Sequence, residues 1–421
     1  MPLTTTPETQ RIQTLDMLRG FALLGILLIN ILGFGLASSS YTYAAPTIAG
    51  TGDLIAWVLV DLGFEGSMRG LFSILFGAGV LLFLDREASG KERAHFKRNA
   101  WLLVFGLING YLLLWPGDIL LTYALAGFVL FFFRNLSTKA LVRWSVSLFL
   151  LLTLYNGLLY GGLHMLRSAH VETEALIAEG KEPSAQQREM ANEWQIFEAD
   201  YQPGPESLAV ELDARRESYT TAFSWNLTHN TGVIAETVPT FLLPDAFVMM
   251  LIGMALYRLG VLQGQRSVEA YRNLAIGGFT LGLLINAYEI STSLGAPGDL
   301  LAGFSQLQPT YHLGRLSVSM GWIGLVVLAI KTEWLANALA AVGRMALTNY
   351  LMQSVVCLFI FTGAGLGLVG ELARYQLYVV VLFVWVFQLR FSPWWLKRYQ
   401  FGPIEWAWRG LTYGQAPRFK R

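Results

Sequence analysis

Apolar segments of membrane-spanning length dominate the sequence and restrict what the chain can fold into. Ten of them lie near 17–36, 67–84, 98–114, 118–134, 141–164, 240–259, 273–292, 312–330, 344–362 and 374–391. A bilayer core requires about 20 apolar residues per helix, and each helix satisfies its own backbone polar groups. Only 14% of the residues are charged, against about 25% in soluble domains. The sequence therefore predicts an all-α, polytopic transmembrane bundle of about ten spans.

The distribution of lysine and arginine predicts the orientation of this bundle. If the N-terminus is cytoplasmic, 22 of the 30 basic residues fall in cytoplasmic segments. The outer loops at 37–53, 115–117 and 293–311 then contain none. Cytoplasmic loops of membrane proteins carry an excess of lysine and arginine. We therefore expect both termini in the cytoplasm.

The expected spans form two halves with a polar segment between them. The halves cover 1–164 and 240–391, and the segment 165–239 contains 13 acidic and 5 basic residues. We expect this segment to be an extracytoplasmic helical loop that serves either as a cap or as a lid over an outer substrate site. The tail 392–421 mixes tryptophan and tyrosine with basic residues, which is typical of an amphipathic helix at a membrane surface. The short acidic stretch 52–66 predicts an interfacial or re-entrant helix.

Polar groups form a seam along the first apolar run, "LDMLRGFALLGILLINI", at 15–31. Asp16 and Arg19 are three residues apart and share a helix face. Asn30 follows Arg19 by eleven residues and so lies near the same face, roughly 16 Å along the axis. Arg19 is either an interfacial residue paired with Asp16 or an anion clamp, because guanidinium grips phosphate and carboxylate groups. Asn30 is suited to helix–helix hydrogen bonding.

Three further positions on the expected cytoplasmic side and one on the outer side are candidate ligand-binding groups. Arg344 lies where a cytoplasmic anion has access, and Asn349 and Gln353 share a helix face four residues apart. Arg69 follows Glu65 by four residues, which predicts a helical ion pair and makes Arg69 a secondary anion ligand.

Four side chains are candidate general bases. Asp118 follows the turn made by Pro116 and Gly117, where it either caps the next helix or acts as a base. His164 and His312 lie at outer ends of expected spans, and histidine titrates near neutral pH. Glu289 lies near another outer end. A single cysteine and five scattered histidines predict no metal site, and a net charge of +1 offers no surface for nucleic acid.

Five ordered motifs carry a resemblance to a known family. "LDMLRGFALLGILLINI", "LFSILFGAGV", "LLLWPGDILLTYALAG", "GRMALTNYLMQS" and "FGPIEWAWRGLTY" together resemble the YeiB-like family of bacterial membrane proteins, domain of unknown function 418. That family in turn looks like part of a wider group of transmembrane acyltransferases. The resemblance implies a multi-pass protein of the bacterial cytoplasmic (inner) membrane. It also implies that acyl-CoA binds from the cytoplasm and that the acyl group reaches an acceptor on the far side.

The resemblance gives the seam residues roles. Arg19 would engage the phosphate or pantetheine portion of acyl-CoA, and Asn30 would orient the thioester or the acceptor. The wider group commonly uses a histidine base, whereas this sequence has Asn109 in "GLING". The base must then be His164, His312, Asp118 or Glu289. The expected acceptor is an envelope glycan, a lipid or a small hydroxylated molecule, the expected partners are membrane lipids, and a homodimer is possible. The alternative is a non-enzymatic transporter or carrier of a small anionic or lipid-linked molecule.

Overall fold

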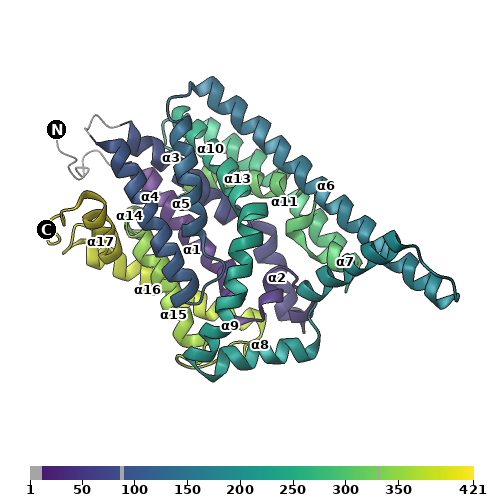
Figure 1. Cartoon of the computed structure of the whole chain (residues 1–421). Coiled ribbons are helices and arrows are strands. Elements are labelled where there is room, and N and C mark those ends of the chain that lie inside the picture. Colours follow the sequence, from purple (N-terminus) through teal and green to yellow (C-terminus); the bar gives the residue numbers. More distant parts are fainter. Residues whose placement is uncertain (1–11, 86–89, 330–331) are drawn as a thin grey trace.

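A computed structural model describes residues 12–85, 90–329 and 332–421, and it confirms the all-α prediction (Figure 1). In this part of the chain the β-structure amounts to one isolated bridge between Tyr399 and Lys420. The helices are α1 (Gln13–Gly35), α2 (Thr51–Gly63), α3 (Ser67–Leu84), α4 (Lys91–Leu107), α5 (Ile119–Leu130), α6 (Thr138–Ala178), α7 (Ala185–Tyr201), α8 (Pro205–Glu217), α9 (Tyr219–Gly232), α10 (Leu243–Arg258), α11 (Val268–Gly295), α12 (Leu300–Gly303), α13 (Tyr311–Ala329), α14 (Glu333–Arg344), α15 (Ala346–Phe361), α16 (Arg374–Leu396) and α17 (Pro403–Tyr413).

The expected apolar segments are all mostly helical, but fewer of them meet the length and composition of a membrane span. Among the described residues, seven helical stretches are long and apolar enough, and the α14–α15 pair, bent by 81°, makes eight. Two of the seven, Thr51–Leu84 and Tyr219–Arg258, each combine successive helices. The stretch Ile119–Phe133 is apolar but shorter. The all-helical class is therefore confirmed, whereas the expected number of ten spans stays a prediction.

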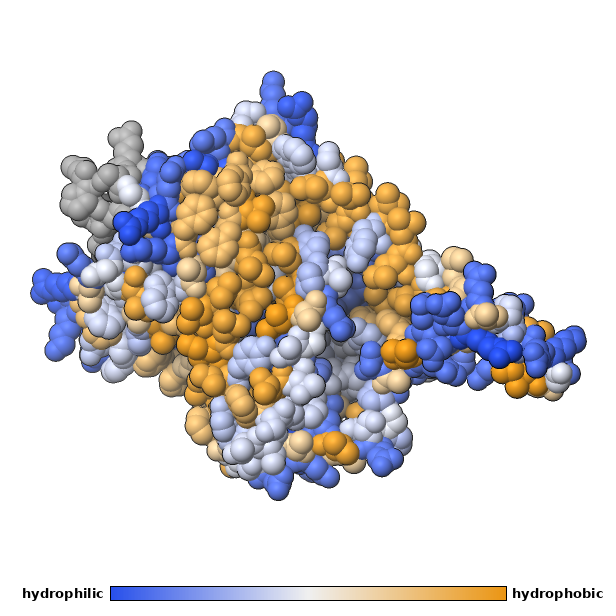
Figure 2. Space-filling model, viewed as in Figure 1, coloured by the Kyte–Doolittle hydropathy of each residue, from blue (hydrophilic) through white to orange (hydrophobic). Residues whose placement is uncertain are grey.

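Two hydrophilic ends flank an apolar band on the surface (Figure 2). At one end, the N-terminal part of α1 and the tail lie beside the basic helix ends. Here Arg258 pairs with Asp85 at 3.1 Å, and the indole of Trp408 donates to the Arg98 carbonyl at 2.9 Å. Arg11, Arg86 and Lys331, which contribute to the predicted basic excess, lie outside the described residues. The opposite end is formed by α7, α8 and the loops that follow α1 and α11.

Glycines allow the helices to approach closely at the centre of the bundle. Gly77 of α3 and Gly253 of α10 face each other, and a Cβ atom at either position would overlap a backbone carbonyl of the other helix. Gly20 of α1 and Gly343 of α14 make a second crossing of the same kind. Small residues that permit backbone contact are a common means of helix association in membranes. The first crossing fixes α3 and α10, which hold two of the buried charges described below.

The segment between the halves is helical, as expected, and closes the end of α1. Arg215 of α8 donates hydrogen bonds of 2.9 Å to the carbonyls of Gly33, Phe34 and Leu36, and it pairs with Glu211 at 2.9 Å. The last carbonyls of a helix lack partners within the helix and carry partial negative charge. A buried guanidinium therefore satisfies the C-terminus of α1.

Replacing Arg215 by alanine is expected to destabilise the fold by about 3 kcal/mol, because it leaves the Glu211 carboxylate and three carbonyls buried without their partner. Thermal unfolding of the detergent-solubilised protein measures this change. Lys181→Ala is the control, since Lys181 is exposed and forms its ion pair with the exposed Glu179. Equal midpoints for the two variants would contradict the capping role of Arg215.

Candidate functional site

A fully buried arginine on α13 holds three carboxylates. Arg315 is 2% exposed. Its Nε lies 2.8 Å from Oε2 of Glu65, its Nη1 lies 3.4 Å from Oε2 of Glu289, and its Nη2 lies 3.6 Å from Oδ1 of Asp61. The carboxylates come from α2, the turn after α2, and α11, so one guanidinium joins three parts of the bundle. Ionisable groups buried at membrane depth mark functional sites in many membrane proteins.

A second group of charges lies beside the first. Arg69 of α3 pairs with Asp245 of α10 through Nε and Oδ2 at 3.3 Å, and Oδ1 of Asp245 lies 3.3 Å from Nδ1 of His312. The Tyr311 hydroxyl joins the two groups, since it accepts from Arg69 at 3.0 Å and donates to Glu65 at 3.2 Å. We call this set the ionic cluster; it comprises Asp61, Glu65, Arg69, Asp245, Glu289, Tyr311, His312 and Arg315.

The ion pair expected between Glu65 and Arg69 is wrong. The four-residue spacing gives a pair only if both residues belong to one continuous helix. Gly66 adopts φ = 63°, so the chain turns between α2 and α3, and α3 begins at Ser67. Glu65 therefore pairs with Arg315, and Arg69 pairs with Asp245. The Tyr311 hydroxyl lies between the two residues that the sequence had paired.

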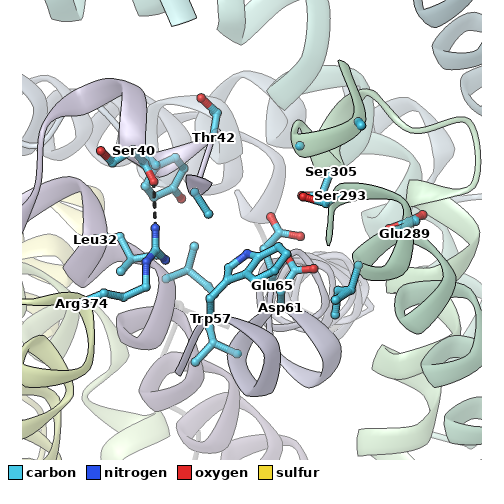
Figure 3. Close-up of a pocket in the computed structure, with 17 residues that line it drawn as sticks. Leu32, Ser40, Thr42, Trp57, Asp61, Glu65, Glu289, Ser293, Ser305 and Arg374 are labelled. Carbon is cyan, nitrogen blue, oxygen red and sulfur yellow. Dashed lines mark hydrogen bonds between the residues drawn. The ribbon is translucent and has the colours of Figure 1, made fainter. Parts of the chain in front are cut away.

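A narrow cavity of about 30 Å³ lies beside the cluster (Figure 3). Its walls carry acidic, aromatic and hydroxyl groups together with one arginine, and the residues that matter here are Tyr41, Trp57, Asp61, Glu65, Glu289, Ser293, Ser305 and Arg374. In Figure 3 the carboxylates of Asp61 and Glu65 lie near Trp57, while Arg374 is on the opposite side and donates to the Ser40 carbonyl at 3.4 Å. A cavity of this volume is large enough to hold at least one water molecule. Figure 2 shows a recess with hydrophilic residues at its floor, where Figure 1 shows α2 between α9 and α11.

The seam on α1 is confirmed at its first step. Arg19 pairs with Asp16 at 2.8 Å and remains partly exposed. Asn30 is buried, and its neighbours Ile29 and Leu32 line the cavity. The seam helix thus runs from Arg19, near the end that holds the C-terminal tail, to the cavity.

Two of the three candidates near the α14–α15 bend make a contact between helices. Arg344 ends α14, whereas Asn349 and Gln353 share a face of α15, as predicted. Asn349 donates to the Ser392 hydroxyl at 3.0 Å, and Gln353 donates to Gln388 at 3.2 Å. Both partners lie on α16. Asn349 and Gln353 therefore tie α15 to α16.

Asp118 and His164, two of the candidate bases, lie outside the ionic cluster. Asp118 caps α5, as predicted, by accepting from the Leu121 N–H at 2.9 Å. It also accepts from Nδ2 of Asn109 at 2.8 Å. His164 is exposed on α6 and packs against Tyr160, with ring centroids 4.5 Å apart. Of the ten candidate site residues, the structure brings Arg69, Glu289 and His312 together in the ionic cluster.

Sequence reasoning missed Asp245, Tyr311 and Arg315. A signal was present for two of them, because Asp245 and Arg315 are charges inside apolar runs of membrane length. Their partners are far away in sequence, so local spacing did not reveal them. The pair formed by Asp245 and His312 is chemically the most informative part of the cluster. A histidine with one ring nitrogen facing a carboxylate is the arrangement that orients a general base.

The comparisons with known proteins agree with the motif resemblance. Residues 256–415 match a family model described as "Protein of unknown function (DUF418)". The chain is 32% identical over 426 residues to the "Uncharacterized protein YeiB" of Escherichia coli K12, with 96% of each chain covered. It is 29% identical over 434 residues to the "Uncharacterized protein YxaH" of Bacillus subtilis, covering 98% of this chain and 96% of that protein. It is also 26% identical over 415 residues to an "Uncharacterized 39.9 kDa protein in amylase 3'region" of Bacillus acidopullulyticus, covering 96% of this chain and 95% of that protein.

Proposed function

The chain belongs to the YeiB-like DUF418 family, and from that premise we propose that it is a membrane acyltransferase that moves an acyl group from acyl-CoA to an acceptor of the cell envelope. The observation that carries this proposal is the Asp245–His312 pair beside Arg69. His312 is 1% exposed, its Nδ1 lies 3.3 Å from Oδ1 of Asp245, and neither ring nitrogen meets the geometry of a hydrogen bond to the described residues. A base, its orienting carboxylate and a guanidinium therefore meet at one point.

The chemistry follows from these three groups. Nε2 of His312 takes the proton of an acceptor hydroxyl as the oxygen attacks the thioester carbonyl. The tetrahedral intermediate carries its negative charge on the former carbonyl oxygen, and the Arg69 guanidinium stabilises such charge in a water-poor site. The intermediate then collapses to the ester, the C–S bond breaks, and the coenzyme A thiolate takes the proton from His312. Asp245 keeps Nδ1 protonated and the ring oriented throughout.

A ten-span topology with both termini in the cytoplasm of a bacterial inner membrane fits this reaction. It places the basic helix ends inside and the ionic cluster toward the outer face. Arg19 and the cavity-lining Leu32 are 13 residues apart on α1, which is about 20 Å along the helix. The long pantetheine arm of coenzyme A spans a distance of this order. Arg19 is thus suited to hold the donor's phosphates while the thioester reaches the cluster.

Access for the acceptor would pass Phe241. This side chain belongs to a π-helical segment, Val233–Leu242, and such segments occur frequently at functional sites. Its ring lies 5.4 Å from the Arg69 guanidinium and 6.0 Å from the His312 ring. Movement of Phe241 would open the cluster toward the surface. The π-helical segment Val233–Leu242 would then supply the lid.

Donor binding tests the proposal directly. We expect saturable binding of acetyl-CoA to the purified protein, weakened about tenfold or more in Arg19→Ala, because a hydrogen bond to a charged group contributes about 1.5–3 kcal/mol. Isothermal titration calorimetry of the detergent-solubilised protein gives the affinity. The same measurement on Arg344→Ala shows whether Arg344 also contributes to acetyl-CoA binding.

Arg188→Ala provides the matched control, since Arg188 is largely exposed on α7 at the other end of the molecule. Absence of binding to folded wild-type protein, tested with several acyl-CoAs, would refute the donor assignment. Equal weakening by Arg19→Ala and Arg188→Ala would refute the role of Arg19.

A second candidate function is a carrier for a small charged solute, and one observation favours it. Four carboxylates of the ionic cluster face two arginines, so the cluster attracts a cation or a proton. Transporters place such groups at their substrate and coupling sites. Uptake of a small charged solute by proteoliposomes in the absence of acyl-CoA would distinguish a carrier from an enzyme.

A further inference from the structure

We propose that the junction of α16 and the C-terminal tail binds the phosphate headgroup of an anionic phospholipid of the surrounding bilayer. The site is a basic patch of exposed side chains, formed by Lys397, Arg398, Lys420 and Arg421. It lies outside the ionic cluster and requires no acyl transfer, so this inference does not rest on the proposed function. Three features carry it: an excess of positive charge, a chain end that folds back, and an apolar helix face that leads to the patch.

Positive charge dominates the last part of the chain. The segment 390–421 contains seven basic residues and one acidic residue, Glu405. Glu405 is directed into the protein, where its carboxylate accepts from the N–H and the hydroxyl of Thr348 at 3.0 and 2.6 Å. Even with a carboxylate on Arg421 counted, seven positive charges face two negative ones within this segment. Figure 2 shows hydrophilic residues at this end of the molecule, where Figure 1 places the C-terminus.

The chain end folds back onto the end of α16 and brings basic residues together. Tyr399 and Lys420 form the isolated antiparallel bridge, and the N–H of Arg421 donates to the Arg398 carbonyl at 3.1 Å. In this antiparallel register Arg398 and Arg421 are directly opposite each other. Like charges at opposite positions destabilise such a pairing. An anion bound by both side chains would convert this repulsion into attraction.

An apolar face of α16 leads to the basic patch. The helix is among the stretches with the length and composition of a membrane span. Its side chains that are 41–68% exposed include Val379, Leu382, Phe383, Val386 and Phe387. From Val386 the same face continues at four-residue intervals with the exposed Arg390, Trp394 and Arg398. Tryptophan is enriched where a bilayer meets water, so the face passes from lipid-contacting to interfacial residues as it approaches the patch.

The length of this face matches one leaflet of a bilayer. Val379 and Arg390 are eleven residues apart on α16, which is roughly 16 Å along the helix, and half of a bilayer core is about 15 Å. A lipid whose chains lie along the face therefore places its phosphate near Arg390 and the basic patch. The Arg398 guanidinium lies 4.4 Å from the Trp394 ring centroid, which holds it at this level. A soluble phosphate would make no use of the apolar face, so the geometry favours a lipid.

Phosphatidylglycerol, added to the full-length protein in a non-ionic detergent, tests the inference. We expect it to raise the thermal unfolding midpoint in a saturable manner, as any ligand of the native state does. Phosphatidylcholine with the same acyl chains, and glycerol phosphate without chains, are expected to have no such effect. In the double variant Lys397→Gln with Arg398→Gln, the phosphatidylglycerol concentration at half-effect should rise about thirtyfold, the usual contribution of two basic residues near an anionic lipid surface.

Lys420→Gln with Arg421→Gln is a second patch variant, so that poor folding of one variant leaves the test intact. Lys181→Gln with Arg188→Gln is the matched control, because it removes two exposed positive charges at the other end of the molecule. Equal responses to the two phospholipids, or wild-type affinity in both patch variants, would overturn the inference. Equal weakening in the control variant would overturn it too. An equal effect of glycerol phosphate would replace the lipid by a soluble anion and so contradict the assignment.

Discussion

Glutamine in place of His312 is expected to lower acyl transfer by about 10²–10⁴-fold, the usual contribution of a positioned general base. Glutamine fills a similar volume and can still face Asp245, but its amide cannot act as a general base. Because His312 is fully buried among Tyr311, Phe241 and Asp245, a polar replacement of similar size preserves the packing. Release of free coenzyme A from acetyl-CoA by protein-containing membranes, with an envelope fraction as acceptor, measures the rate.

The control for this prediction is His164→Gln. His164 is exposed on α6 and contacts Tyr160, outside the ionic cluster. We expect its rate to equal that of the wild type, and acetyl-CoA binding to be the same in both variants. Full activity in His312→Gln would remove the Asp245–His312 pair from the mechanism, and Glu289 would then be the next base to test.

Asp245 is proposed to position His312 and Arg69 rather than to contact the substrate. Its replacement can therefore show whether it serves catalysis or only the stability of the fold. Asparagine at this position keeps the shape but removes the charge that faces both Nδ1 of His312 and Nε of Arg69. We expect a lower maximal rate with little change in acetyl-CoA affinity, and an altered dependence of the rate on pH. A purely structural role would instead lower stability and leave the pH dependence of the remaining activity unchanged.

The contrast between what the sequence predicted and what it missed follows from the range of the interactions. The Asp16–Arg19 pair and the Asp118 cap were predictable because both span three residues within one helix. The shared face of Asn349 and Gln353 was predictable for the same reason. Arg69 pairs with a residue 176 positions away, and Arg315 with one 250 positions away. Such contacts depend on how the helices cross.

Gly66 shows why even a local rule failed once. The rule of four-residue spacing assumes an unbroken helix, and the left-handed turn at Gly66 ends one helix and starts another. A glycine pair around Glu65, in "GFEG", was the available warning. The consequence is functional, because the turn releases Glu65 toward Arg315 and brings it to the wall of the cavity.

Replacement of Arg315 by leucine is expected to have the largest effect on stability in the molecule. All three carboxylates of the cavity would lose the guanidinium that they share, and removal of one partner from a buried ion pair costs about 3–5 kcal/mol. Thermal unfolding in detergent and the yield of folded protein in membranes measure the loss. Arg390→Leu is the control, since Arg390 is exposed on α16; it should unfold at nearly the wild-type temperature.

A second substitution shows whether the loss arises from charge. If repulsion among the unpartnered carboxylates causes the loss of stability, the double variant Arg315→Leu with Glu65→Gln should be more stable than Arg315→Leu alone. Glu65→Gln by itself should destabilise the wild type, because it removes the 2.8 Å contact with Arg315. Such a change of sign in the double-mutant cycle is a coupling between neighbouring sites. If both substitutions lowered stability additively, the arginine would matter for packing rather than for charge.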